Sequence, residues 1–231
     1  MERKFGRLRS FDERSRNHRI LSLVRGLEPL NKLWKLSRLL DQLTTSACVG
    51  HGISHEILCE PVVGVVDHNY AMMLYNEAKK VDEWPGEDYD GTSVLAGMKV
   101  AKKLGWYESY DWAFTLEEII LAVSHVGPVV MGTNWYEGME TPEPHTGLVK
   151  PTGWNLGGHC WIINGNNLGG FFDCSNSWGT SWGINGTFRI THEDLWYLME
   201  HGGECCLPSG RKNTLVTGMC SKIKTAIGGY L

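Results

Sequence analysis

The stretch from residue 41 to residue 51 constrains this chain more than any other. A loop of small residues, 44–47, leads into apolar residues at helical spacing, namely Val49, Ile53, Ile57 and Leu58. The pattern predicts a helix that carries Cys48 in its first turn, where unpaired backbone N–H groups and the helix dipole favour a thiolate. Gln42, six residues upstream, has an amide that can donate a hydrogen bond to an oxyanion. By itself the pattern is more typical of a small, buried, structural cysteine, because free Cys is among the most buried residue types.

Two later stretches supply the side chains that a nucleophilic cysteine needs. Residues 157–165, GGHCWIING, place His159 after two glycines at the start of a β-like run. Residues 173–190, DCSNSWGTSWGINGTFRI, place Asn176 in a turn rich in Trp and Gly that precedes another strand. A nucleophile, a base and a group that orients the base are the components of covalent acyl transfer.

These stretches resemble the papain-like cysteine peptidases. Residues 176–190 match that family's asparagine motif, NSWGTxWGxNGxxRI, and the interval from Gln42 to Cys48 matches its six-residue step. The Gln, Cys, His and Asn also come in the family's order, and the resemblance covers roughly residues 38–206. It implies an α+β, papain-like fold of two lobes. A helical N-terminal lobe and an antiparallel, β-barrel-like C-terminal lobe would have the active-site cleft between them.

The resemblance implies a cysteine endopeptidase that works through a thioester acyl-enzyme. Cys48 would be the nucleophile, and His159 would take its proton and later protonate the leaving amine. Asn176 would bond the other ring nitrogen, and Trp178 would shield that bond from water. Gln42 and the Cys48 N–H would form the oxyanion hole. The expected partner is a protein or peptide substrate, and no cofactor is implied.

Two further residues are candidate substrate contacts, in addition to Trp178. Gly91 stands where the family has a Gly-Gly step whose backbone pairs with an extended substrate. Trp135 follows a predicted buried strand, 127–132, in the region that lines the family's cleft. It is therefore expected either to face the substrate or to pack in the core.

Several positions depart from the family's pattern. Val49 replaces the usual Trp after the nucleophile, and Leu43-Thr44-Thr45 replaces Gly-x-Cys. The interval of 111 residues between Cys48 and His159 is below the ~130–150 of the plant and lysosomal members. With the phrases WPGEDYDGTS and GTNWY, these features look like bacterial and bacteriophage-encoded relatives. They do not indicate a substrate preference.

Composition favours two lobes and argues against a membrane or secreted protein. A chain of 231 residues with 42% hydrophobic residues and 10 Trp can bury a large core. No apolar run approaches the ~20 residues of a membrane span, and the N-terminus lacks the apolar segment of a signal peptide. The 7 Cys form no CxxC pair, and Thr45 stands where secreted members have a half-cystine. We therefore expect a reduced, cytoplasmic protein, or one in the host cytoplasm or virion if it is phage-encoded.

The first 40 residues form a basic N-terminal arm. They hold 11 of the 22 Lys and Arg but 4 of the 26 Asp and Glu, which leaves 11 basic and 22 acidic residues in the remainder. The arm is expected to be extended or loosely helical and to lie electrostatically over the acidic body. Nucleic acid is a less favoured partner, because no aromatic residues interleave the charges and no known module is present. The family's inhibitory pro-segment is much longer, so control by a folded pro-domain is not expected.

After the arm, we expect a helical lobe over 41–124, a β-rich lobe over 125–210 and a flexible tail over 211–231. Helices in the first lobe are predicted at about 48–59, 70–81, 94–104 and 116–124, with Ser93 and Thr115 as N-caps of the last two. The acidic loop 82–93 is expected to be solvated, because its spacing misses the calcium-loop pattern.

Three alternatives stay open on the sequence. Cys48, His51 and His55 share one face of the predicted helix and could hold zinc, although no fourth ligand is evident. The same cysteine chemistry could serve an amidase or transpeptidase acting on cell-wall or other peptide-like substrates. The chain could also be a catalytically inactive papain-like domain used for binding, but the presence of all four site residues argues against that. The sequence does not indicate an oligomeric state.

Overall fold

An antiparallel sheet of seven strands runs through the computed structural model, which describes residues 3–10 and 12–212. The strands follow the order β2-β7-β3-β4-β5-β6, and β1 pairs with β4 off this path. Their bounds are Lys32–Leu33 (β1), Ser109–Ala113 (β2), Val129–Tyr136 (β3), Asn155–Asn167 (β4), Phe171–Ser175 (β5), Thr187–Thr191 (β6) and Glu204–Ser209 (β7). The tail expected over 211–231 lies almost wholly outside the described residues.

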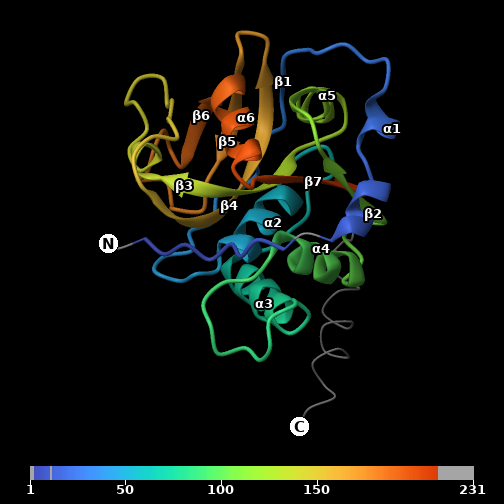
Figure 1. Cartoon of the computed structure of the whole chain (residues 1–231), viewed down its shortest axis with the longest axis vertical. Helices are drawn as coiled ribbons and strands as arrows, with labels where there is room; N and C mark the ends of the chain where they lie inside the picture. Colours follow the sequence, from blue (N-terminus) through green and yellow to red (C-terminus); the bar gives the residue numbers. More distant parts are fainter. Residues whose placement is uncertain (1–2, 11, 213–231) are drawn as a thin grey trace.

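Helices cover both faces of this sheet. The α-helices span Leu21–Val24 (α1), Cys48–Ile57 (α2), His68–Lys79 (α3), Val94–Lys103 (α4), Leu116–His125 (α5) and His192–Glu200 (α6), and 3-10 helices span Glu13–Asn17 and Glu137–Met139. In Figure 1, α2, α3 and α4 lie on one side of the sheet and α5 and α6 on the other. Within the described ranges, no helix has the length and apolar character needed to span a membrane.

Alternating residues of the central strands pack into two separate cores. Val130 of β3 and Ile162 of β4 belong to the core with α2, α3 and α4. Their neighbours, Met131 and Trp161, belong to the core with α5 and α6. Successive side chains of a strand point to opposite faces, so one sheet serves both cores. The same alternation places two adjacent residues of β4, His159 and Cys160, on opposite faces.

Helix α2 is buried along its whole length between α3 and the sheet. Two glycines permit this close packing. A Cβ at Gly50 would lie 2.1 Å from the carbonyl oxygen of Ala71 in α3, and a Cβ at Gly52 would lie 2.7 Å from the sulfur of Cys160 in β4. The helix therefore holds Cys48, its first residue, in a fixed place beside the sheet.

The predicted helices are confirmed, with small shifts at their ends. Ser93 caps α4, and Thr115 forms a capping box with Glu118 at the start of α5. Helix α3 begins two residues earlier than predicted, because the side chain of Asp67 accepts a hydrogen bond from Tyr70 N and caps it there. The lobe boundary predicted after residue 124 assigned α5 to the helical lobe. In the structure, α5 packs in the core that also contains residues of β3 and β4. Strand β2, just before it, already pairs with β7 at the sheet edge.

Candidate active site

Cys48 is the first residue of α2 and is completely buried. Burial raises the pKa of its thiol to about 11. Hydrogen bonds from the backbone at Cys160, Gly6 and Val49 oppose this increase only in part. In the state that the structure describes, Cys48 is therefore a thiol at neutral pH, although its place at the start of a helix is the one that the sequence predicts for a nucleophile.

His159, on β4, is held by two groups from the asparagine motif. Its Nε2 bonds Asn176 Oδ1 over 2.8 Å, and its ring centroid lies 4.8 Å from that of Trp178. An amide oxygen only accepts hydrogen bonds, so Nε2 carries the proton. The other nitrogen, Nδ1, is buried and has no partner in the described part of the chain. It is the ring nitrogen that can accept a proton.

The pair of Cys48 and His159 is not ionised in this arrangement. Burial lowers the pKa of His159 to about 4; its bond to Asn176 raises the pKa in part, and the charge of Arg3 lowers it. Among the described residues, no hydrogen bond joins the cysteine sulfur to this imidazole. The structure thus places the predicted nucleophile and base on two packed elements, α2 and β4, as a neutral thiol and a neutral imidazole.

Residues 3–8 of the N-terminal arm cross this site. Gln42, the predicted oxyanion donor, donates from Nε2 to the Lys4 carbonyl over 3.0 Å and to the Thr45 carbonyl over 2.7 Å. Gly6 N donates to the Gly158 carbonyl over 3.1 Å. In Figure 1 this segment runs from the N-terminus across α2. The arm thus occupies hydrogen-bonding groups of the predicted active site with its own backbone.

Two backbone hydrogen bonds to Thr92 hold the second half of residues 3–8. Thr92 N donates to the Gly6 carbonyl, and Leu8 N donates to the Thr92 carbonyl, each over 2.9 Å. The side chain of Phe5 packs edge-on against the rings of His159 and Trp178, with centroids 5.8 and 6.0 Å away. Residues 3–8 are therefore bound as an extended peptide, through backbone pairing and a ring contact.

Glycines on both sides allow the arm to come this close. A Cβ at Gly6 would lie 1.8 Å from the Ser46 carbonyl oxygen. On the body of the protein, a Cβ at Gly158 would lie 2.0 Å from the Arg7 carbonyl oxygen, and one at Gly91 would lie 2.6 Å from the Gly6 carbonyl oxygen. Gly91 also has φ +102°, a conformation that favours glycine.

Solved structures show the same arrangement of elements, whereas sequence comparison finds nothing: no family model and no curated protein matches this chain. Xylellain, a cysteine protease from Xylella fastidiosa, matches with a TM-score of 0.68 and 15% identity over 92% of this chain and 99% of its own. The fold is papain-like.

Two more solved structures support the papain-like fold. Digestive procathepsin L2 from the Tenebrio molitor larval midgut matches with a TM-score of 0.59 and 16% identity over 90% of this chain and 78% of its own. Bromelain from Ananas comosus, in complex with the E64 inhibitor, matches with a TM-score of 0.54 and 13% identity over 75% of this chain and 94% of its own. The predicted α+β class and the predicted resemblance are confirmed.

Within this papain-like fold, the arm contacts two of the three predicted substrate contacts. Gly91 packs against the backbone of the arm, and the carbonyl of Trp178 accepts a hydrogen bond from Arg3 Nη2 over 3.0 Å. Trp135 is fully buried behind His159, with ring centroids 5.0 Å apart. Of the two places expected for Trp135, the structure shows the one in the core. A role for Gly91, Trp135 or Trp178 in substrate binding stays a prediction.

Sequence reasoning missed three residues at the site. Thr92 pairs with the arm backbone next to the predicted Gly91. Ser177 donates from Oγ to Gln42 Oε1 over 2.7 Å and so orients the amide. Ser177 lies inside the asparagine motif, which was a usable signal. The third residue, Glu204, lies on β7 and accepts a hydrogen bond from Arg7 of the arm. No motif surrounds it in the sequence.

The structure gives no support to the zinc alternative. His51 bonds the Ala47 carbonyl through Nδ1 over 2.9 Å and His68 through Nε2 over 3.1 Å. His55 Nε2 accepts from Leu40 N over 2.8 Å. Both ring nitrogens of His51 and Nε2 of His55 therefore have partners within the protein in place of a metal ion. No three His, Cys, Asp or Glu side chains are grouped as a metal site within the described ranges.

The ion pairs of the arm agree with the expectation that it lies electrostatically on the acidic body. Arg3, Lys4 and Arg7 pair over 3.8, 3.4 and 2.8 Å with Asp41, Asp90 and Glu204, respectively. Two of the pairs are partly exposed and contribute little each. What the sequence did not indicate is the path of the arm, which leads these cations over the active site.

Proposed function

We propose that this chain is a cysteine-type peptidase that hydrolyses peptide bonds through Cys48, His159 and Asn176. One observation carries the proposal: the site binds an extended peptide backbone, that of the arm, and turns the Gln42 amide toward one of its carbonyl oxygens. A donor that meets a peptide carbonyl beside a cysteine is the arrangement that acyl transfer requires. The papain-like fold supports the same conclusion.

In the proposed reaction, His159 Nδ1 accepts the proton of Cys48, whose sulfur attacks the carbonyl carbon of the substrate. The oxyanion that forms is stabilised by Gln42 Nε2 and the Cys48 N–H, each donor being worth about 3 kcal/mol in comparable sites. The imidazolium then protonates the leaving amine, and a thioester remains. Water, deprotonated by the imidazole, releases the acid product. Asn176 holds the ring orientation throughout.

The arm must leave the site before a substrate can bind. The Lys4 carbonyl occupies the Gln42 donor, and Phe5 packs on the His159 ring. The arm also helps to bury Cys48, because the backbone at Gly6 bonds its sulfur. The proposed enzyme is therefore inactive in the closed state and becomes active as residues 3–8 are displaced.

A peptide-cleavage assay on full-length variants tests the proposal. Gly6→Ala places a Cβ 1.8 Å from a backbone oxygen and should displace the arm. Incubated with a mixed peptide library, this variant should generate new peptide termini, detected by mass spectrometry, and Gly6→Ala with Cys48→Ala should generate none. If the first variant cleaves no peptide although its Cys48 reacts with an epoxide warhead, the chain is not a peptidase, and amidase or transpeptidase substrates should be tried instead.

A further inference from the structure

The loop of residues 40–47 connects the two donors of the proposed oxyanion hole. It carries Gln42 and leads into Cys48, the first residue of α2. Leu43, directly after Gln42, has φ +55° although it is not a glycine. A residue in this left-handed region keeps its conformation only where surrounding groups hold it. The loop therefore needs anchors on both sides of the Gln42 amide.

One histidine of α2 holds the start of the loop. Nε2 of His55 accepts a hydrogen bond from Leu40 N over 2.8 Å. A backbone N–H only donates, so Nε2 carries no proton and the proton of the neutral ring is on Nδ1. This Nδ1 is buried and has no partner among the described residues. An apolar side chain would avoid the penalty of a buried, unpaired N–H, so packing alone does not explain a histidine at this position. The acceptor that it offers to Leu40 does.

A pair of histidines connects the two ends of the loop. Nδ1 of His68, the first residue of α3, lies 3.1 Å from the Asp41 carbonyl oxygen and 3.1 Å from His51 Nε2. Nδ1 of His51 lies 2.9 Å from the Ala47 carbonyl oxygen. A carbonyl oxygen only accepts, so both Nδ1 atoms carry protons and donate, and His51 Nε2 accepts. The pair thus ties the residue before the oxyanion amide to the residue before the nucleophile.

These anchors are independent of the arm. In the described part of the chain, the hydrogen bonds of the three histidines go to the loop and to one another, and none goes to residues 3–8. The Gln42 amide, in contrast, loses the Lys4 carbonyl when the arm leaves, and it keeps the bond from Ser177. In the open state, the direction of the amide therefore depends on Ser177 and on the loop that the histidines hold.

We propose that three histidines, His51, His55 and His68, are positioning residues of the oxyanion hole. They hold the loop so that the Gln42 amide and the Cys48 N–H point at the same oxygen. They touch neither the substrate nor the reacting atoms, and this role rests on the proposed peptidase function. A displacement of about 1 Å can lower a rate on the order of a hundredfold, so a loosened loop should reduce kcat and leave substrate binding nearly intact.

A pair of substitutions at position 55 tests this role. The host is the full chain with Gly6→Ala to displace the arm, and the substrate is a peptide that this host cleaves. His55→Leu removes the acceptor of the Leu40 N–H and should lower kcat by about 10- to 100-fold, with KM nearly unchanged. His55→Gln keeps an acceptor near the position of Nε2 and should restore most of kcat. Alkylation of Cys48 should keep the rate of the host in both variants.

A double-mutant cycle with Gln42→Ala distinguishes positioning from a general structural effect. If His55 acts through Gln42, His55→Leu should change kcat by less than about twofold once residue 42 is alanine. An equal loss of kcat in both backgrounds overturns the proposal, because the histidine then acts on something other than the amide.

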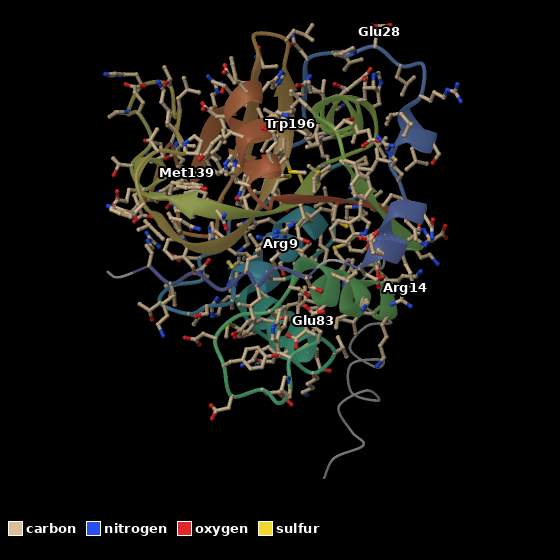
Figure 2. All side chains as sticks on the ribbon, viewed as in Figure 1. Arg9, Arg14, Glu28, Glu83, Met139 and Trp196 are labelled. Atoms are coloured by element: carbon tan, nitrogen blue, oxygen red, sulfur yellow. The ribbon has the colours of Figure 1, made fainter. Side chains whose placement is uncertain are left out.

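His192→Leu is the matched control for the loss of a helical histidine. Nε2 of His192 bonds Asn166 Oδ1 over 3.1 Å. His192 begins α6, the helix that carries Trp196 in Figure 2 and lies on the other side of the sheet from α2. This variant should leave kcat unchanged. A fall in kcat equal to that of His55→Leu would mean that the loss of a buried ring, and not the anchoring of the loop, is what the assay detects.

Hydrogen exchange measures the loop without turnover. The N–H of Gln42 donates to the Ser177 carbonyl over 2.8 Å. In the Gly6→Ala host with Cys48→Ala, its protection from exchange should fall with His55→Leu and stay the same with His55→Gln. Equal protection in both overturns the anchoring. If protection differs as expected but the host with Cys48 intact cleaves no peptide, the histidines hold the loop and the peptidase function is refuted. Cleavage with equal kcat in all variants at position 55 leaves the peptidase function standing and overturns the positioning role.

A second pair of variants replaces the first if His55→Leu does not fold, as judged by its melting temperature. His68 is only partly buried. His68→Leu removes the donor to Asp41 and His51, whereas His68→Asn keeps a donor near the position of Nδ1. The same loss of kcat with leucine, its recovery with asparagine and its absence in the Gln42→Ala background are expected, and equal kcat for the two variants overturns the role.

Discussion

The substitution Gly6→Ala should convert Cys48 from a protected thiol into a reactive one. The added Cβ would lie 1.8 Å from the carbonyl oxygen of Ser46, a backbone atom that precedes α2 and cannot move without the helix. Residues 3–8 belong to none of the helices and strands of the body, so they should yield to this clash and leave the cleft while the body keeps its structure. This exposes Cys48, which is completely buried in the closed state.

The size of the effect follows from the ionisation of the thiol. With the pKa of Cys48 at about 11, about one molecule in 10⁴ is a thiolate at pH 7. At a helix start beside an imidazole the pKa falls to about 7, which leaves about half ionised, roughly 5,000-fold more. A fall of four units in the pKa of the thiol reduces its nucleophilicity by about 40- to 100-fold. Alkylation at pH 7 should therefore accelerate by about 50- to 125-fold, before the gain in access is counted.

Iodoacetamide labelling, quantified for each cysteine by peptide mass spectrometry between pH 5 and 10, measures this effect. In the parent chain the rate at Cys48 should still rise at the alkaline end, whereas in Gly6→Ala it should level off near neutrality. Gly26→Ala is the control: it lies further along the N-terminal segment, no atom is within 4 Å of its added Cβ, and the strain from its φ of +79° falls outside residues 3–8. Equal rates and equal pH profiles for Gly6→Ala and the parent would show that the arm does not keep the thiol protonated.

Three further predictions concern the protein with residues 3–8 displaced and the acid stability of the fold. His159→Ala should abolish peptide turnover, whereas Asn176→Ala should leave a measurable kcat, because the amide orients the imidazole but exchanges no proton; equal residual rates would contradict these roles. Gln42→Ala should lower kcat by about a hundredfold or more and leave thiol alkylation nearly intact, and an unchanged kcat would remove it from the oxyanion hole. Burial lowers the pKa of His51 to about 4 and of His55 to about 3. The unfolded chain therefore binds more protons below pH ~6.5, and each such imidazole should reduce the free energy of unfolding by about 1.4 kcal/mol per pH unit as the pH falls toward 4. Urea unfolding at pH 7, 5.5 and 4.5 measures this, and a flat profile contradicts it.

Local features predicted the helices and the order of the site residues. Ser93 and Thr115 cap their helices because a side-chain oxygen can reach a backbone N–H two or three residues on, wherever the helix lies in the fold. Cys48 begins α2 for a similar reason, since the apolar spacing that follows it dictates the helix. The bond from His159 to Asn176 was inferred from a motif, and the structure shows it.

The sequence predicted less well which elements pack against one another in the two cores. The lobe boundary predicted at residue 124 separated α5 from β3, although the two share one core. The apolar face of α5 predicts that the helix is buried, but it does not say against which element. Similarly, Trp135 is equally apolar on a cleft wall and in a core, and only its packing against His159 shows which place it takes.

The sequence by itself determined which side chains can do chemistry and which short segments form helices, because both depend on residues close together in the chain. Tertiary structure alone decided that the arm lies in the site and that Arg7 meets Glu204, 197 residues away. Many of the contacts that hold residues 3–8 in the site are made by backbone N–H and carbonyl groups, which all residues except proline carry, and these contacts therefore leave no mark in the sequence. Glycines such as Gly6 and Gly158 permit the approach, but their role becomes visible only when the two backbones are seen 3 Å apart.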